Sequence, residues 1–189
     1  MLGRTLLNTT RKSVFIRFNS TATNEAYNVV LNGLKKDLKQ ALLSKNEVKK
    51  TTIRNMMASL KNKSIDSKTH TIDTFGIYAT YEKMINQRKD SITEYLNNKR
   101  EDLVEKEQKE LDIIKEYQKL LPVISKEELK SNVKKLLESL KQEDSTIELK
   151  GIFSKVDWKS LPDEWKASKN MIKSSIVEQY NAHYATWKK

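Results

Sequence analysis

The most regular feature of the chain is the spacing of its apolar residues from position 24 onward. Five of them step along the first segment by three or four residues: Tyr27, Leu31, Leu34, Leu38 and Leu42. This spacing is typical of the apolar face of an amphipathic α-helix. Similar stripes predict further helices over about 47–63, 75–97 and 100–121. No segment alternates convincingly as a half-buried strand would, so the pattern predicts an all-α fold.

Polar residues and capping signals set the expected ends of these helices. The stretch 64–74 is polar and predicts a loop, and either Asp73 or Thr74 can cap the helix that follows. Asn98 marks the break before the fourth helix and, with Glu101 three residues later, fits a capping box. Because so few residues separate them, the third and fourth helices are expected to form an antiparallel hairpin.

Pro122 is the best candidate for a domain boundary, because proline disfavours the helical conformation of the residue before it. Residues 24–122 are then expected to form a helical-hairpin domain. Residues 125–189 are expected to form a smaller helical tail.

Three helices are expected in this tail. The first follows a second capping box, formed by Ser125 and Glu128. A short helix over about 149–156 comes next. A last helix starts at Leu161 and carries Trp165.

The N-terminal residues differ in composition from the rest of the chain. They are rich in serine and threonine, and no acid precedes Glu25. Their basic residues are Arg4, Arg11, Lys12 and Arg17. This composition is typical of a mitochondrial presequence, although a merely disordered basic tail is the alternative. Since the sequence around Arg17 resembles a matrix-peptidase site, we predict a presequence over 1–19 and a mature chain in the matrix that begins close to Ser20.

Positive charge dominates the chain and is unevenly distributed. The formal net charge is +11 and the isoelectric point is about 9.6, which favours a polyanionic partner. Between residues 35 and 68 there are ten basic and three acidic residues. The candidate nucleic-acid contacts in this stretch are Lys35, Lys36, Lys39, Lys49, Lys50, Arg54, Lys61 and Lys63. The alternative is an ordinary solvated lysine face.

Residues suited to catalysis or metal binding are scarce. The chain has no cysteine, so disulfides, thiolate zinc sites and cysteine nucleophiles are excluded. Neither His70 nor His183 has a cysteine or a second histidine at metal-binding spacing, and the four glycines are isolated. We therefore predict no catalytic residue, no metal and no cofactor. No apolar run is long enough to span a membrane.

The most charge-dense stretch, residues 87–110, has six basic and seven acidic residues. Pairs four residues apart explain most of these charges as a solvated helix surface. Arg88 is different, because helical spacing places it on or beside the apolar stripe, and Glu107 and Glu110 lie on a similar stripe of the next helix. A charge at such a seam is costly unless it is paired. We therefore expect Arg88 to pair with Glu107 or Glu110 and to fix the register of the hairpin.

Four segments in order carry a family resemblance. They are TIRNMM at 52–57, QRKDS at 87–91, REDLVEKE at 100–107 and YQKLLPVISKEEL at 117–129. Together they resemble the signature of the YqeY family and extend over nearly all of 30–140. The resemblance implies an N-terminal helical-hairpin domain and a three-helix tail similar to that of GatB.

GatB is a subunit of the glutamine-dependent aminoacyl-tRNA amidotransferase, and its tail helps to contact tRNA. The resemblance therefore implies a tRNA-linked or other RNA-binding accessory protein, related to the amidotransferase by similarity only. The catalytic parts of GatB are absent, so we predict no independent active site. The alternative is a protein-interaction module that docks on the amidotransferase or the ribosome through Trp158, Trp165 and Trp187. These tryptophans can equally fill the core of the tail.

Overall fold

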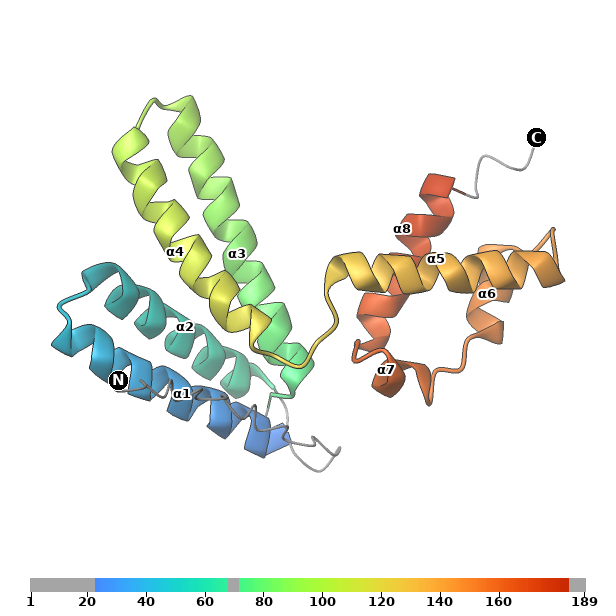
Figure 1. Cartoon of the computed structure of the whole chain (residues 1–189), viewed down its shortest axis with the longest axis horizontal. Helices are drawn as coiled ribbons and strands as arrows, with labels where there is room; N and C mark the ends of the chain where they lie inside the picture. Colours follow the sequence, from blue (N-terminus) through green and yellow to red (C-terminus); the bar gives the residue numbers. More distant parts are fainter. Residues whose placement is uncertain (1–22, 68–71, 184–189) are drawn as a thin grey trace, which may run out of the picture.

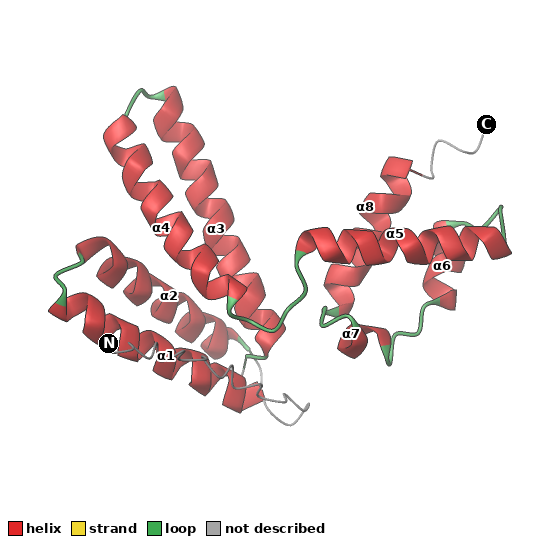
Figure 2. Ribbon diagram, in the orientation of Figure 1, coloured by secondary structure: helices red, strands yellow, loops and turns green. Residues whose placement is uncertain are grey.

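The fold was obtained as a computed structural model, which describes residues 23–67 and 72–183 (Figure 1). All regular structure in these residues is α-helical, with no strand (Figure 2). The all-α fold predicted from the apolar spacing is therefore confirmed. The predicted presequence, residues 1–19, lies outside the described residues.

Eight helices follow one another along the described chain, four before Pro122 and four after it. They are α1 (Thr23–Leu43), α2 (Glu47–Asp66), α3 (Thr74–Asn97), α4 (Glu101–Lys119), α5 (Lys126–Glu143), α6 (Leu149–Lys155), α7 (Leu161–Glu164) and α8 (Lys169–His183). Helix α2 extends three residues beyond the predicted end at 63, because Ser64–Asp66 continue its hydrogen bonding instead of forming a loop.

Helices α1 to α4 form two hairpins that share one hydrophobic core. Residues from all four helices are buried there, including Leu34, Ile53, Tyr81 and Ile114. Helices α3 and α4 run side by side, and the turn that joins them lies far from the tail (Figure 1). The hairpin expected from the short connection is therefore present.

Helices α5 to α8 surround a second core, which includes Val133, Ile152, Ile172 and Ile176. Helix α5 crosses α8, and the short helices α6 and α7 lie along the connection between them (Figure 1). Residues 121–124 join the two cores. That the two halves fold as separate domains stays a prediction.

The expectation of a single last helix from Leu161 is wrong. Helix α7 ends at Glu164, and Lys166 adopts the left-handed conformation with φ of 49°. The amide of Ala167 then donates to the carbonyl of Pro162, which closes the turn before α8 begins. The tail therefore has four helices among its described residues instead of three.

Side-chain caps explain where several of the helices begin. Asp73 is the N-cap of α3, and its carboxylate accepts a hydrogen bond of 2.7 Å from the amide of Gly76. Ser125 caps α5 in the same way through the amide of Glu128. The predicted cap at Asn98 is wrong, because Asn98 ends α3, while α4 begins after Arg100 without a side-chain cap.

Candidate nucleic-acid interface

The basic residues of the N-terminal half gather on the α1/α2 hairpin. Its described residues, 23–67, include nine basic and four acidic residues. The next segment, 72–121, contains the α3/α4 hairpin and has nine basic and eleven acidic residues. The two hairpins that share a core thus carry opposite net charge, and a polyanion would be attracted to the first.

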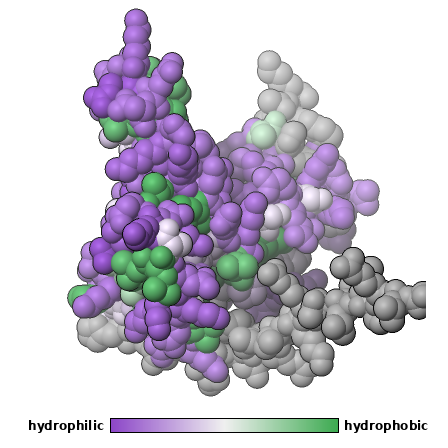
Figure 3. Space-filling view, turned by 60° about the vertical axis from the view of Figure 1, so that its left-hand side comes forward, coloured by the Kyte–Doolittle hydropathy of each residue, from purple (hydrophilic) through white to green (hydrophobic). Residues whose placement is uncertain are grey.

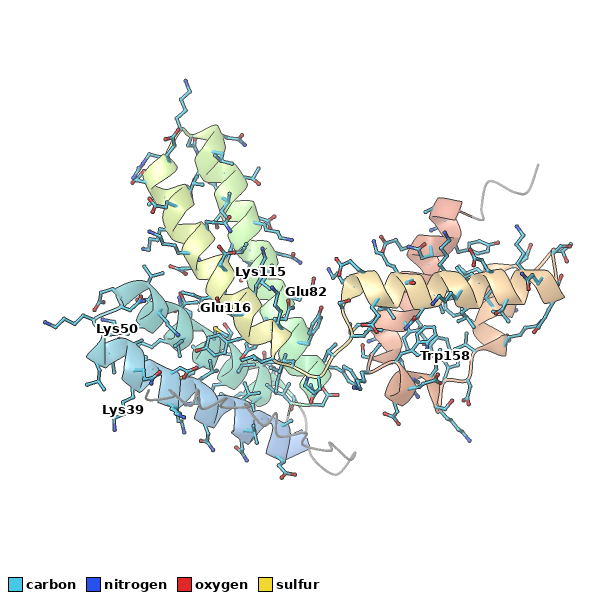
Figure 4. All side chains as sticks on the ribbon, in the orientation of Figure 1. Lys39, Lys50, Glu82, Lys115, Glu116 and Trp158 are labelled. Carbon is cyan, nitrogen blue, oxygen red and sulfur yellow. The ribbon has the colours of Figure 1, made fainter. Side chains whose placement is uncertain are left out.

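The structure separates the eight predicted contact residues by exposure. Lys49 and Lys50 are half-buried, and Lys50 forms an ion pair with Glu47. The other six are exposed, and none of them has an ion pair within the described part of the chain. These six are Lys35, Lys36, Lys39, Arg54, Lys61 and Lys63. Lys39 projects from α1 away from the hairpin, and Lys50 lies near the start of α2 (Figure 4). These six exposed residues are therefore the predicted contacts whose charges are free to bind a nucleic acid.

Helical spacing arranges this exposed set in rows. On α2, Arg54 and Lys61 are seven residues apart and lie on one face, in line with Lys50. On α1, Lys35 and Lys39 are one turn apart, about 6 Å along the axis. Lys63 lies off the α2 row. The hairpin therefore presents rows of cations that, apart from Lys50, form no ion pair with an acidic residue in the described part of the chain.

Asp37 is the acidic residue that lies among the exposed lysines of α1, and a hydrogen bond to α4 holds its side chain toward the core. The hydroxyl of Tyr117 donates to Oδ2 of Asp37 over 2.7 Å. Burial raises the pKa of Tyr117, and the hydrogen bond to Asp37 raises it further, so the hydroxyl keeps its proton at neutral pH. This contact joins the two hairpins and keeps the Asp37 carboxylate toward α4.

A buried ion pair joins α3 to α4. Nη1 of Arg88 lies 2.8 Å from Oε2 of Glu107 and 3.6 Å from Oε2 of Glu110. Both carboxylates are buried, whereas Arg88 is half-buried. Burial lowers the pKa of Arg88, but its hydrogen bond with Glu107 and the two negative charges raise it more. Arg88 stays charged and binds two glutamates of the facing helix, an arrangement suited to holding the hairpin together.

The tail has a groove of about 800 Å³ between the 122–124 linker, α5 and α7. Its apolar lining residues are Pro122, Val123, Ile124, Leu136, Leu161 and Trp165. Trp158 lies elsewhere, because its indole donates to the carbonyl of Phe153 over 2.9 Å and its ring lies under the ammonium of Lys173. Both Trp158 and Trp165 pack against the core of the tail, Trp165 also lines the groove, and Trp187 lies outside the described residues.

The described residues contain no group of three or more histidine, aspartate or glutamate side chains able to hold a metal ion. His70 and the side chain of His183 lie outside the described part. Two features had no signal in the sequence: the Tyr117–Asp37 hydrogen bond, whose partners are 80 positions apart, and the groove beside Trp165. No helix in the described ranges is long and apolar enough to cross a membrane.

Comparison with known protein families shows which family the chain belongs to. The family described as Yqey-like protein matches residues 31–156, which is more than half of the sequence. The chain belongs to the YqeY family. The match covers all of α2 to α6 and most of α1, so both the basic hairpin and the Arg88 ion pair lie within the family region of this YqeY protein.

Yeast relatives extend the similarity beyond this region. The chain is 53% identical over 166 residues to a protein of Vanderwaltozyma polyspora, covering 88% of this chain and 89% of the relative. It is 51% identical over 168 residues to a Saccharomyces cerevisiae protein, with the same coverage. A Kluyveromyces lactis protein is 49% identical over 166 residues, covering 88% of each chain. All three are named altered inheritance of mitochondria protein 41, mitochondrial, in agreement with the mitochondrial location predicted for this YqeY protein.

Proposed function

We propose that this YqeY protein is an RNA-binding accessory protein of the mitochondrial matrix and that the α1/α2 hairpin is its RNA contact. The observation that carries the proposal is the set of six exposed, unpaired cations on a hairpin whose described residues have nine basic and four acidic side chains. Lysine and arginine side chains bind nucleic-acid phosphates and release counterions, which is a sequence-independent source of affinity. We propose no catalytic activity for the protein.

Transfer RNA is the RNA we propose. The support is the resemblance of the tail, in its sequence, to the tRNA-contacting tail of GatB. Under this proposal the hairpin provides phosphate affinity, and the tail provides any preference for tRNA over other RNA. The protein would be related to the amidotransferase through this shared recognition rather than through catalysis.

Retardation of tRNA across a salt series tests the phosphate contacts. The triple variant Lys39→Gln, Arg54→Gln, Lys61→Gln removes three exposed cations. It should weaken binding and reduce the slope of log K against log salt by roughly 0.7–0.9 for each phosphate that is no longer neutralised. The matched control is Lys83→Gln, Lys89→Gln, Lys119→Gln, because it removes three exposed lysines from the α3/α4 hairpin, where nine basic residues are outnumbered by eleven acidic ones.

The proposal fails if the two triple variants bind tRNA equally well. It also fails if the unmodified protein binds tRNA no more tightly than a size-matched acidic control protein does. Crosslinking in intact mitochondria, followed by purification and sequencing of the attached RNA, then identifies the RNA class. Recovery of other RNA without tRNA would retain the hairpin contact and reject the tRNA assignment.

A second candidate function is docking on a protein of the mitochondrial translation apparatus, such as the amidotransferase or the ribosome. The groove beside Trp165 favours it, because aromatic residues are enriched in protein interfaces. Leu136 and Trp165 line the groove and are only half-buried, so a partner side chain can reach them. If Trp165→Ala abolished a reproducible crosslink to a translation protein while tRNA retardation was unchanged, this second function would be favoured.

A further inference from the structure

The turn between α1 and α2 exposes leucine side chains next to lysine side chains, and RNA binding would explain only the lysines. Leu42 and Leu43 end α1 and are 48% and 77% exposed. Within 39–50 there are four lysines and a single acid, Glu47, which pairs with Lys50. Figure 3 brings this side of the molecule forward and shows small hydrophobic patches within a largely hydrophilic surface. The leucines lie beside cations on a projecting end of the hairpin.

These leucines differ from the other exposed apolar residues. Six large hydrophobic residues are exposed in the described part of the chain, and Leu42 and Leu43 are the adjacent pair among them. Leu96 lies at the end of the other hairpin, but the charges near it are balanced, because Arg100 pairs with Asp102. A single exposed leucine is ordinary on a protein surface. An adjacent pair surrounded by unbalanced lysines is not explained in that way.

We propose that the α1–α2 turn is a peripheral attachment site for an anionic lipid bilayer. Such a surface offers both components that the turn can bind: acidic headgroups for the lysines and acyl chains for the two leucines. An RNA backbone would bind the lysines and leave the leucines in water, whereas an apolar protein groove would bind the leucines and gain nothing from the surrounding cations. Attachment is peripheral, because no helix in the described ranges can cross a membrane.

Flotation with lipid vesicles tests the proposal, using vesicles of phosphatidylcholine alone and vesicles that also contain phosphatidylglycerol. The chain is used from Ser20, the predicted mature start, because a basic leader would itself bind acidic lipid. The protein should float with the acidic vesicles and not with the neutral ones. The double variant Leu42→Ser, Leu43→Ser should weaken partitioning by about tenfold for each leucine.

The matched control is Leu96→Ser, Leu120→Ser, which replaces two leucines that are 55% and 78% exposed elsewhere on α3 and after α4. It should bind acidic vesicles as the unchanged protein does. Circular dichroism checks that both double variants keep their helices, as expected for exposed positions. The proposal is overturned if the unchanged protein does not float, or if both double variants bind equally well.

Two further outcomes would also overturn it. If the Leu42→Ser, Leu43→Ser variant lost tRNA binding, measured by retardation, as strongly as it lost vesicle binding, the turn would belong to the RNA interface. If acidic vesicles bound the double variant without loss, lysines alone would account for lipid binding. The two proposals share Lys39, so each has its own measurement. Failure of the RNA proposal is read from tRNA retardation of its triple variant and α3/α4 control, which keep both leucines, and failure of the lipid proposal is read from flotation of the Leu42→Ser, Leu43→Ser variant, which keeps every lysine.

Discussion

Arg88 of α3 donates a hydrogen bond from Nη1 to Oε2 of Glu107 on α4 over 2.8 Å, and Glu110 lies one turn further along. Two buried carboxylates therefore depend on one guanidinium, and the contact spans the two helices of the hairpin. Breaking a buried ion pair costs more than forming it gains, since the remaining charge stays desolvated. The ion pair can act as a register lock for α3 against α4.

Replacing Arg88→Met should lower the free energy of unfolding by about 3 kcal/mol, because both glutamates lose their counter-charge. Urea unfolding followed by circular dichroism measures this loss. Lys89→Met is the matched control, since Lys89 is exposed and should change stability by less than about 0.5 kcal/mol. Adding Glu107→Met to Arg88→Met should recover part of the loss. An Arg88→Met protein with unchanged stability and unchanged amide exchange in α3 and α4 would reject the register lock.

Glu110 should make stability fall as pH rises. Burial raises the pKa of Glu110 above its ordinary value, and repulsion from Glu107 adds to this, although Arg88 opposes it. The folded protein thus binds this proton more tightly than the unfolded chain does. Above the ordinary glutamate pKa of about 4.3, stability is lost until the pH exceeds the folded pKa. Glu110→Gln should remove that loss, so its unfolding free energy should fall less between acid and neutral pH.

Glu105 provides a control of opposite sign on the same helix. Its exposed carboxylate accepts a hydrogen bond of 2.6 Å from Lys109, which lowers the pKa of Glu105. A lowered pKa stabilises the folded protein above the ordinary value, and this stabilisation is lost as pH falls. Glu105→Gln should therefore lose a little stability at neutral pH and none in acid. Equal pH profiles for the two variants would contradict the assignment of Glu110.

The Tyr117–Asp37 hydrogen bond should link the basic hairpin to α4. Tyr117→Phe should cost about 1.5 kcal/mol, because it removes a donor to a carboxylate while keeping the ring in the core. A double-mutant cycle with Asp37→Ala measures the coupling by urea unfolding. Tyr27→Phe is the control, since the hydroxyl of Tyr27 has no hydrogen bond in the described residues. Additive effects of the Tyr117 and Asp37 changes would mean that the contact contributes nothing to stability.

Periodic features of this protein could be predicted from the sequence. The helical stripes predicted α1 to α4, because a core shared by two hairpins buries one face of each helix. The same spacing put Arg88 on the seam that faces Glu107. Contacts between distant segments could not be predicted, since no local pattern indicates that Tyr117 meets Asp37 or that Trp165 lines a groove with α5.

Helix ends were harder to predict, because they depend on which backbone hydrogen bonds close each turn. A lysine carries the left-handed conformation at the ends of α1, α3 and α7: Lys45, Lys99 and Lys166. Glycine is the usual residue there, so lysine gives no signal for the break. This explains why the end of α7 was missed, and why the cap between α3 and α4 was predicted at Asn98 instead.

Lys99→Gly should stabilise the protein by about 0.5–1 kcal/mol, because Lys99 has φ of 55° and glycine avoids the cost of a side chain in that region. The amides of Lys99 and Arg100 donate to the carbonyls of Leu96 and Tyr95, and glycine keeps both bonds. Asn98→Gly is the matched control. Asn98 has φ of −91° and its side chain donates to the carbonyl of Glu94, so that change should destabilise the hairpin. Thermal unfolding of both variants measures the difference, and stabilisation by Asn98→Gly instead would mean that the left-handed residue lies one position earlier.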